Sequence, residues 1–234
     1  MQTVLAMAPH RPTRPSYSAA AFDAARREIT LDAGAVLYPE ASPITAVYRV
    51  QSGVVRSCRS LADGRRHVAG FAFPGDVVGL DGTTVHLFAA EAVTAVRLLR
   101  TPYRGLAQFD DATDGPAHAE PLASLLLRAL LAAQEGQVAL GRMSAVERVA
   151  RFLLAIDERL GPDDRGGFTL PMSRYDIADH LGLTFETVSR AISRLRTAAL
   201  IALPDPHRVR ILDRVRMQAI AEGSSAVPRR SRAG

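Results

Sequence analysis

Hydrophobic and polar residues alternate in short, β-branched runs over residues 29–99. Each run ends at turn-forming residues, and such clusters recur at intervals typical of short strands. The pattern predicts a small antiparallel β-barrel or sandwich. The predicted turns lie at residues 32–34, 51–53, 62–64, 74–76 and 81–82.

The segments on either side of this β region lack its alternation. Residues 1–17 contain three prolines and no lasting periodicity, which predicts a flexible arm. Residues 18–27 predict a short helix capped by Ser18, and residues 110–121 form a turn-rich connector. We therefore expect one domain over residues 18–120.

Residues 121–143 repeat hydrophobic positions in steps of four and three, which predicts a long helix with two neighbouring heptad seams. Such a helix fits either the core of one subunit or a parallel homodimer. The first seam, which we expect to mediate dimerisation, contains Leu126, Leu130, Ala133, Gln137 and Leu140. The second seam contains Leu127, Leu131, Gln134 and Val138.

A C-terminal domain over residues 144–222 begins with a helical pattern at residues 144–160. Ser144 and Glu147 have the spacing of a capping box. The buried face of this helix should contain Val146, Val149, Ala150, Leu153 and Leu154.

Residues 172–195 predict a helix-turn-helix, two helices joined by a tight turn. Ser173 and Asp176 form a second capping box, Gly182 is free to adopt a positive φ, and Thr184 caps the second helix. The apolar faces comprise Ile177, Ala178 and Leu181 on the first helix and Val188, Ala191, Ile192 and Leu195 on the second.

Four polar residues, Glu186, Ser189, Arg190 and Arg194, share the opposite face of the second helix. Arg190 can donate two hydrogen bonds to guanine, and Glu186 can accept one from cytosine. Alternatively, Glu186 and Arg190 form an ordinary ion pair on a solvated helix. The combination of caps, turn glycine and apolar stripe favours DNA binding over that alternative.

Residues 201–211 alternate on both sides of a Pro-Asp-Pro-His turn, which predicts a β-hairpin wing. Arg208 and Arg210 lie on its polar side and should contact phosphates. Residues 223–234 predict a flexible tail. With one helix-turn-helix per chain, a symmetric DNA site requires two copies, which favours the homodimer.

Composition narrows the class of protein. The chain has 234 residues, 47% of them hydrophobic, and its net charge is +5. Of 29 basic residues, 11 follow position 171, against 6 of 24 acidic ones, so the net positive charge lies around the helix-turn-helix. No apolar run approaches the roughly 20 residues of a membrane span, and no secretory signal precedes the domains, so we expect a cytoplasmic location.

The order of β-domain, long helix and winged helix-turn-helix resembles the CRP/FNR superfamily of bacterial transcription regulators. The most similar stretches are VYRVQSGVVRS, GFAFPGDVVGLDG and MSRYDIADHLGLTFETVSR. The resemblance implies an α+β fold: an N-terminal antiparallel β-roll, a dimerisation helix and a C-terminal winged helix-turn-helix. It also implies a homodimer that binds double-stranded DNA and contacts RNA polymerase.

Within the superfamily, the run ETVSR resembles the FNR and FixK branch. Phe185 replaces the arginine of the cyclic-AMP receptor branch, and an apolar ring there can contact a thymine methyl group. The resemblance implies a FixK-like regulator, an activator of genes for microaerobic respiration, denitrification or nitrogen fixation, and a target resembling TTGAT-N4-ATCAA. The expected DNA-binding residues are Ser173, Thr184, Phe185, Glu186, Ser189, Arg190, Arg194, Arg208 and Arg210.

The β-roll lacks the residues that would bind the usual effectors of the superfamily. Asp76 takes the place of the glutamate that binds ribose, and His86 and Leu87 take the place of the Arg-Ser pair that binds cyclic phosphate. Cyclic AMP is therefore not expected. A single cysteine, Cys58, excludes an internal disulfide and a four-cysteine iron–sulfur cluster. We expect no cofactor.

Three alternatives remain. Haem could bind through His67, His86 or His118 in a sensor of nitric oxide or carbon monoxide. Cys58 could act as a redox switch if Arg56 or Arg59 stabilised its thiolate. An enzyme is the third class, but we find no nucleophile with its base, phosphate-binding loop or metal-bound water motif.

Overall fold

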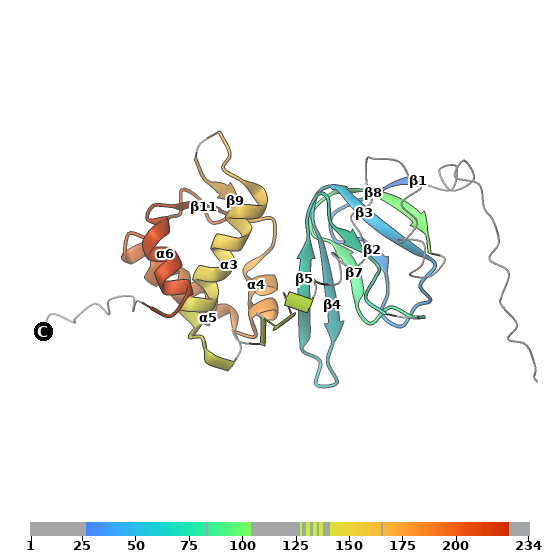
Figure 1. The fold of residues 1–234 in the computed structure, drawn as a ribbon, viewed down its shortest axis with the longest axis horizontal. Helices are drawn as coiled ribbons and strands as arrows, with labels where there is room; N and C mark the ends of the chain where they lie inside the picture. Colours follow the sequence, from blue (N-terminus) through green and yellow to red (C-terminus); the bar gives the residue numbers. More distant parts are fainter. Residues whose placement is uncertain are drawn as a thin grey trace, which may run out of the picture.

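The computed structural model of the chain describes residues 27–82, 84–103, 127, 130–131, 133–134, 136–137, 141–164 and 166–224. An N-terminal half of β-strands lies beside a C-terminal half of helices and a small sheet (Figure 1). The predicted α+β fold class is confirmed. The predicted arm, most of the N-terminal helix, the connector and most of the tail lie outside the described residues. Arg27, expected to end that helix, instead begins the first strand.

The β-roll consists of two four-stranded sheets in which every pair of neighbours is antiparallel. One sheet has the order β1-β8-β3-β6 and the other β2-β7-β4-β5. The strands are β1 (Arg27–Leu31), β2 (Val36–Tyr38), β3 (Ala46–Ser52), β4 (Val55–Ser60), β5 (Arg66–Ala72), β6 (Val77–Val78), β7 (Ala89–Ala92) and β8 (Val96–Pro102).

Alternation along the strands directs small and β-branched side chains into the space between the sheets, where Val50, Val55, Ala90 and Leu98 are buried. The predicted turns separate the strands. At the turn between β3 and β4, Gly53 has a φ of 82°, and a Cβ atom there would lie 2.2 Å from the carbonyl oxygen of Ala95. Only glycine fits this turn.

The described residues of the predicted dimerisation helix are helical except Met143, and they include Leu130, Ala133 and Gln137 of the first seam. Leu126 and Leu140 lie outside the described residues. Leu127, Leu130 and Leu131 have exposed fractions of 56%, 55% and 49%, so this chain alone does not cover them. Among the described residues, no helix is both long and apolar enough to cross a membrane.

The C-terminal half packs four helices around one core and adds a three-stranded sheet of order β10-β11-β9. Ser144 and Glu147 form the predicted capping box. The wing hairpin is confirmed, but its third strand, β9, was not predicted. The elements are α3 (Ala145–Leu160), β9 (Phe168–Thr169), α4 (Arg174–Leu181), α5 (Phe185–Thr197), β10 (Ile201–Ala202), β11 (Arg208–Ile211) and α6 (Arg214–Ala221).

The two halves share a hydrophobic contact, which we call the domain interface. Val54 and Phe73 of the β-roll belong to the same buried cluster as the core of the C-terminal half. The ring of His180 on α4 lies 5.4 Å from that of Phe71 and 5.7 Å from that of Phe152, and its Nδ1 is 3.0 Å from the carbonyl oxygen of Val68. The β-roll therefore packs directly on α3 and α4.

Burial at this interface lowers the pKa of His180 below its ordinary value near 6.5. The unfolded chain then binds a proton at higher pH than the folded chain does, so stability should fall as the pH drops through about 6.5. We expect His180→Gln, whose amide can donate to Val68, to reduce the fall in melting temperature between pH 7.5 and 5.5. The matched control is exposed His207→Gln in the wing, which should behave like the wild type. Equal pH dependence in all three proteins would contradict the prediction.

Candidate nucleic-acid interface

The first helix of the helix-turn-helix, α4, begins at the predicted capping box. The hydroxyl of Ser173 accepts a hydrogen bond from the backbone N–H of Asp176 at 3.1 Å. In return, Oδ2 of Asp176 accepts from the backbone N–H and the hydroxyl of Ser173, at 3.0 and 2.7 Å. These bonds satisfy N–H groups that every helix start leaves without an intrahelical partner.

The turn and the second helix, α5, also form as predicted. Gly182 adopts the left-handed conformation, with φ 62° and ψ 42°, and ends α4. The hydroxyl of Thr184 accepts from the backbone N–H of Thr187 at 3.2 Å and caps α5. The predicted stripe of Val188, Ala191, Ile192 and Leu195 is buried. Local spacing alone therefore defines where both helices start and which faces they bury.

The opposite face of α5 is open to solvent. Glu186, Arg190 and Arg194 are exposed and Ser189 is half-buried. The Nη2 atom of Arg190 donates to the hydroxyl of Thr187 at 3.1 Å. Hydrogen bonds from the backbone N–H of Glu186 and from Thr184, and the charge of Arg190, hold the pKa of Glu186 below its usual range. Arg190 as a hydrogen-bond donor and Glu186 as an acceptor thus face the solvent together, as readout of base edges requires.

An aromatic pair extends this face at the start of both helices. The exposed ring of Tyr175 stacks on the half-buried ring of Phe185, with centroids 4.6 Å apart and planes 24° apart. Phe185 was predicted from the sequence to contact DNA, whereas Tyr175, which is 64% exposed, was not. Its position two residues after the Ser173 cap was the available signal. The pair presents an apolar surface beside the polar residues of α5.

The two arginines of the wing differ in their surroundings. The guanidinium of Arg208 pairs with Asp163, and its side chain is only 13% exposed. Arg210 is exposed. The sequence placed both on one polar side of β11, and their different partners arise from Asp163, which precedes β9. Arg210 is therefore the better placed of the two to contact a phosphate.

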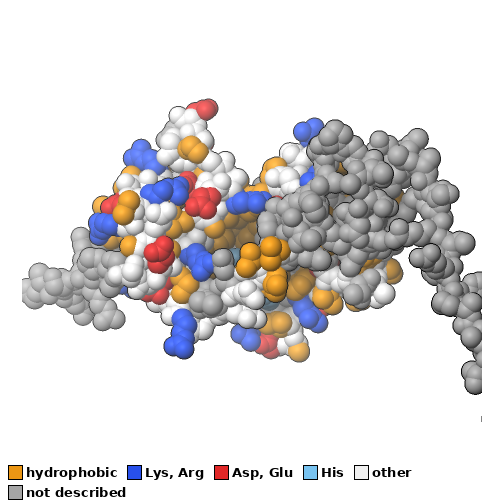
Figure 2. Space-filling model, viewed as in Figure 1, with side chains coloured by type: hydrophobic (Ala, Val, Ile, Leu, Met, Phe, Trp, Pro, Cys, Tyr) orange, Lys and Arg blue, Asp and Glu red, His pale blue; other side chains and the backbone are white. Residues whose placement is uncertain are grey.

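The wing is also joined to α4. The Nη2 atom of Arg174, the first residue of α4, donates to the carbonyl oxygen of Pro206 in the wing turn at 3.0 Å. This bond holds the wing turn against the start of the helix-turn-helix. Arginine side chains spread over the C-terminal half in Figure 2, with acidic side chains among them. The exposed arginines of this half include Arg190 and Arg194 on α5 and Arg210 on β11.

His86, which the resemblance predicts in place of a cyclic-phosphate arginine, is buried inside the β-roll. His86 is 3% exposed, and its Nδ1 lies 2.8 Å from Oδ1 of Asp81, whose Oδ2 accepts from the backbone N–H of Phe88. The ring of Tyr38 stacks on the imidazole with centroids 3.6 Å apart. Burial and the nearby Asp81 raise the pKa of Tyr38, so this phenol remains neutral.

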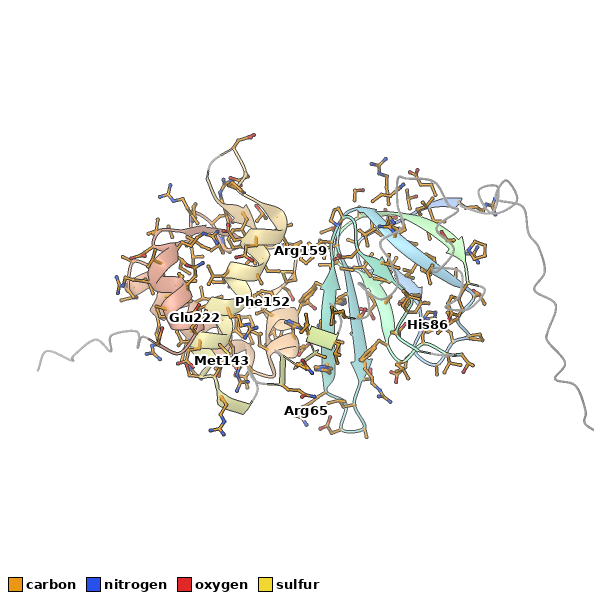
Figure 3. All side chains as sticks on the ribbon, in the orientation of Figure 1. Arg65, His86, Met143, Phe152, Arg159 and Glu222 are labelled. Carbon is orange, nitrogen blue, oxygen red and sulfur yellow. The ribbon has the colours of Figure 1, made fainter. Side chains whose placement is uncertain are left out.

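Asp76, which the resemblance predicts in place of a ribose-binding glutamate, also has partners within the chain. Its Oδ2 accepts from the backbone N–H of Phe73 at 2.9 Å and pairs with Arg159 near the end of α3. The guanidinium of Arg159 lies 5.5 Å from the centre of the Phe73 ring. In Figure 3 Arg159 lies on the side of α3 that faces the β-roll. Asp76 thus contacts the C-terminal half.

The surroundings of Cys58 do not favour a thiolate. The thiol is buried, and burial together with the charge of Glu91 raises its pKa, while Arg56 and Arg66 have smaller effects in the opposite direction. Arg59, the other candidate partner, pairs with Glu40 at 2.8 Å. A redox switch at Cys58 would require Arg56 or Arg59 to stabilise the thiolate, and these surroundings do not favour it.

Comparisons with known proteins agree with this geometry. Residues 147–220 match the Crp-like helix-turn-helix domain, and residues 28–112 match the cyclic nucleotide-binding domain. The nitrogen fixation regulation protein FixK of Bradyrhizobium diazoefficiens is 38% identical over 204 residues, covering 86% of this chain and 84% of that protein. The chain belongs to the CRP/FNR family.

Other FixK proteins are similar to this regulator. FixK of Azorhizobium caulinodans is 44% identical over 171 residues, which cover 72% of this chain and 68% of the relative. The structure of FixK2 from Bradyrhizobium japonicum superposes with a TM-score of 0.74 at 35% identity, covering 87% of this chain and 99% of that one. The chain is therefore a FixK-like, DNA-binding transcription regulator and not an enzyme.

We expect the wing arginines to contribute differently to DNA binding. Arg210→Ala should remove about one phosphate contact per bound subunit, weaken binding to every duplex alike, and reduce the slope of log K against log salt by about 0.9 for each subunit. Arg208→Ala, which removes the same charge, should leave the slope unchanged because Asp163 occupies its guanidinium. Fluorescence anisotropy over a salt series measures both slopes. Equal changes in both variants would contradict this assignment.

Proposed function

We propose that the chain acts as a FixK-type homodimer, a transcription activator that binds a palindrome resembling TTGAT-N4-ATCAA. Its targets would be genes of microaerobic respiration, denitrification or nitrogen fixation, and its β-roll would contact RNA polymerase. The observation that carries the proposal is the solvent-exposed face of α5, with Glu186, Ser189 and Arg190 in the ETVSR order. The similarity to FixK proteins supports the class of target genes.

The exposed leucines of the long helix support the homodimer. Leu127, Leu130 and Leu131 lie on two adjoining seams, and a second copy of the same helix would cover both. A dimer also supplies the two helix-turn-helix units that a palindrome needs. In the sequence the two seams repeat over residues 126–140, which matches a second copy of the same helix better than an unrelated partner.

The interior of the β-roll supports binding without a cofactor. A cyclic nucleotide would need a carboxylate for the ribose, and Asp76 is paired with Arg159. Haem would need a histidine whose ring can approach iron, but His86 is only 3% exposed and Tyr38 packs against it, so iron could reach it only if the β-roll rearranged. His67 is exposed on the β-roll surface. Control of the protein's amount would then replace control by a ligand.

The first test is fluorescence anisotropy of the purified regulator on a TTGAT-N4-ATCAA duplex and on a scrambled duplex at one salt concentration. We expect selective binding with nothing added. Arg190→Ala should cost about 1 to 3 kcal/mol on the palindrome and relax the preference for its guanine. An equal loss on both duplexes would show that Arg190 contacts only phosphate. Selectivity that appears only after haem is added would favour the ligand-gated sensor instead.

Dimerisation can be tested independently of DNA. Leu130→Asp places a charge in the first seam, where a dimer would bury it. Because burying a carboxylate costs free energy, this variant should sediment as a monomer to a larger extent than the wild type. Leu130→Met preserves volume and apolar character and should remain dimeric. A dimer that survives the aspartate would mean that Leu130 lies outside the contact between subunits.

A further inference from the structure

Two arginines of the β-roll meet carboxylates of the helix-turn-helix at the domain interface. Nη1 of Arg56 on β4 lies 2.8 Å from Oδ1 of Asp176, and Nη2 of Arg66 on β5 lies 2.6 Å from the same oxygen. Nε of Arg66 also donates to Oδ2 of Asp179 at 2.9 Å. Of the two strands, β5 lies beside α4 in Figure 1. We call these contacts, with Glu91 bound to Arg56 at 2.6 Å, the arginine clamp.

The clamp uses an oxygen that the helix cap leaves available. Oδ2 of Asp176 accepts from Ser173, whereas Oδ1 accepts from Arg56 and Arg66. The side chain of Asp176 is only 5% exposed, so losing these partners would leave a buried charge poorly paired. The start of α4 is consequently fixed to the β-roll through one carboxylate.

A second ionic contact joins α3 to the β-roll. Arg159 pairs with Asp76 and lies over the ring of Phe73, and the rings of Phe71, Phe152 and His180 contact one another at the same domain interface. Attachment at two separated points restricts rotation as well as translation. The orientation of the helix-turn-helix relative to the β-roll is therefore defined within one chain.

This arrangement leaves the DNA-binding face open. The start of α4 at Ser173 and Tyr175, the polar face of α5 at Glu186 and Arg190, and Arg210 of the wing are all exposed while the clamp is formed. In helix-turn-helix proteins the first helix crosses the DNA backbone and the second enters the major groove. A fixed α4 therefore also fixes the direction of α5.

We propose that Arg56 and Arg66 are positioning residues for DNA recognition. By holding α4 on the β-roll, they preorganise the two recognition helices of a dimer at the spacing of a palindrome, without a ligand. This proposal rests on the proposed function, since it requires a dimer on a symmetric site. Since Arg56 and Arg66 are paired with carboxylates of α4, they should affect how two half-sites are bound together and leave the contacts within each half-site unchanged.

Arg66→Ala is the sharpest test, because the bonds of Arg66 to α4 can be removed without leaving Glu91 unpaired. We expect this variant to bind the TTGAT-N4-ATCAA duplex about tenfold more weakly in fluorescence anisotropy. Its affinity for a duplex with one half-site, and its salt dependence, should match the wild type. The control is Arg65→Ala in the β4–β5 hairpin (Figure 3), an exposed arginine paired only with Asp63 among the described contacts, which should bind both duplexes normally.

Asp179→Ala provides a second route that leaves the capping box intact. It should weaken palindrome binding less than Arg66→Ala, and the double variant should be no weaker than Arg66→Ala alone, because the two residues share one interaction. Unchanged or tighter palindrome binding by Arg66→Ala would overturn the proposal. Tighter binding would mean that the arginine clamp opposes the orientation of α4 that DNA binding needs. Equal losses on both duplexes would also overturn it. A wild type without selectivity would instead overturn the proposed function.

Discussion

The carboxylate of Asp176 is held by groups from both halves of the chain. Its position in a capping box requires one oxygen to face the start of α4, and the strands of the β-roll bring two guanidinium groups to the other. Burial by itself would raise the pKa of Asp176, but the hydrogen bonds from Ser173 and the charges of Arg56 and Arg66 outweigh it, so the pKa lies below the usual value. The group therefore remains ionised at neutral pH, and both sets of contacts persist.

Interactions between residues close in the chain could be predicted from the sequence. The caps at Ser144, Ser173 and Thr184, the left-handed Gly182 and the buried stripe of α5 depend on spacings of a few residues, and the structure confirms each. The alternating runs of the β-roll and its turns were predictable for the same reason. Strand order was not, because alternation indicates which face is buried and not which strand is the neighbour.

Contacts between distant segments could not be predicted in this way. The sequence gives no indication that Arg66 meets Asp179 or that Arg208 meets Asp163, since these pairs are separated by 113 and 45 residues. The two-residue strand β9 lacks enough length to show alternation. Tyr175 was missed because its exposure and its stacking on Phe185 depend on how α4 and α5 cross. The side chains of the candidate site could thus be predicted from the sequence, whereas the contacts between distant segments that hold them in place could not.

The domain interface also limits how this fold can be rearranged in evolution or in the laboratory. Many regulators are treated as two modules joined by a helix, each exchangeable with its counterpart in a relative. Here the helix-turn-helix has a buried carboxylate at its first turn whose charge is balanced by arginines of the β-roll. A chimera that moved only residues 144–222 onto a β-roll without those arginines would bury that charge unbalanced. The unit of exchange in this chain therefore includes strands β4 and β5.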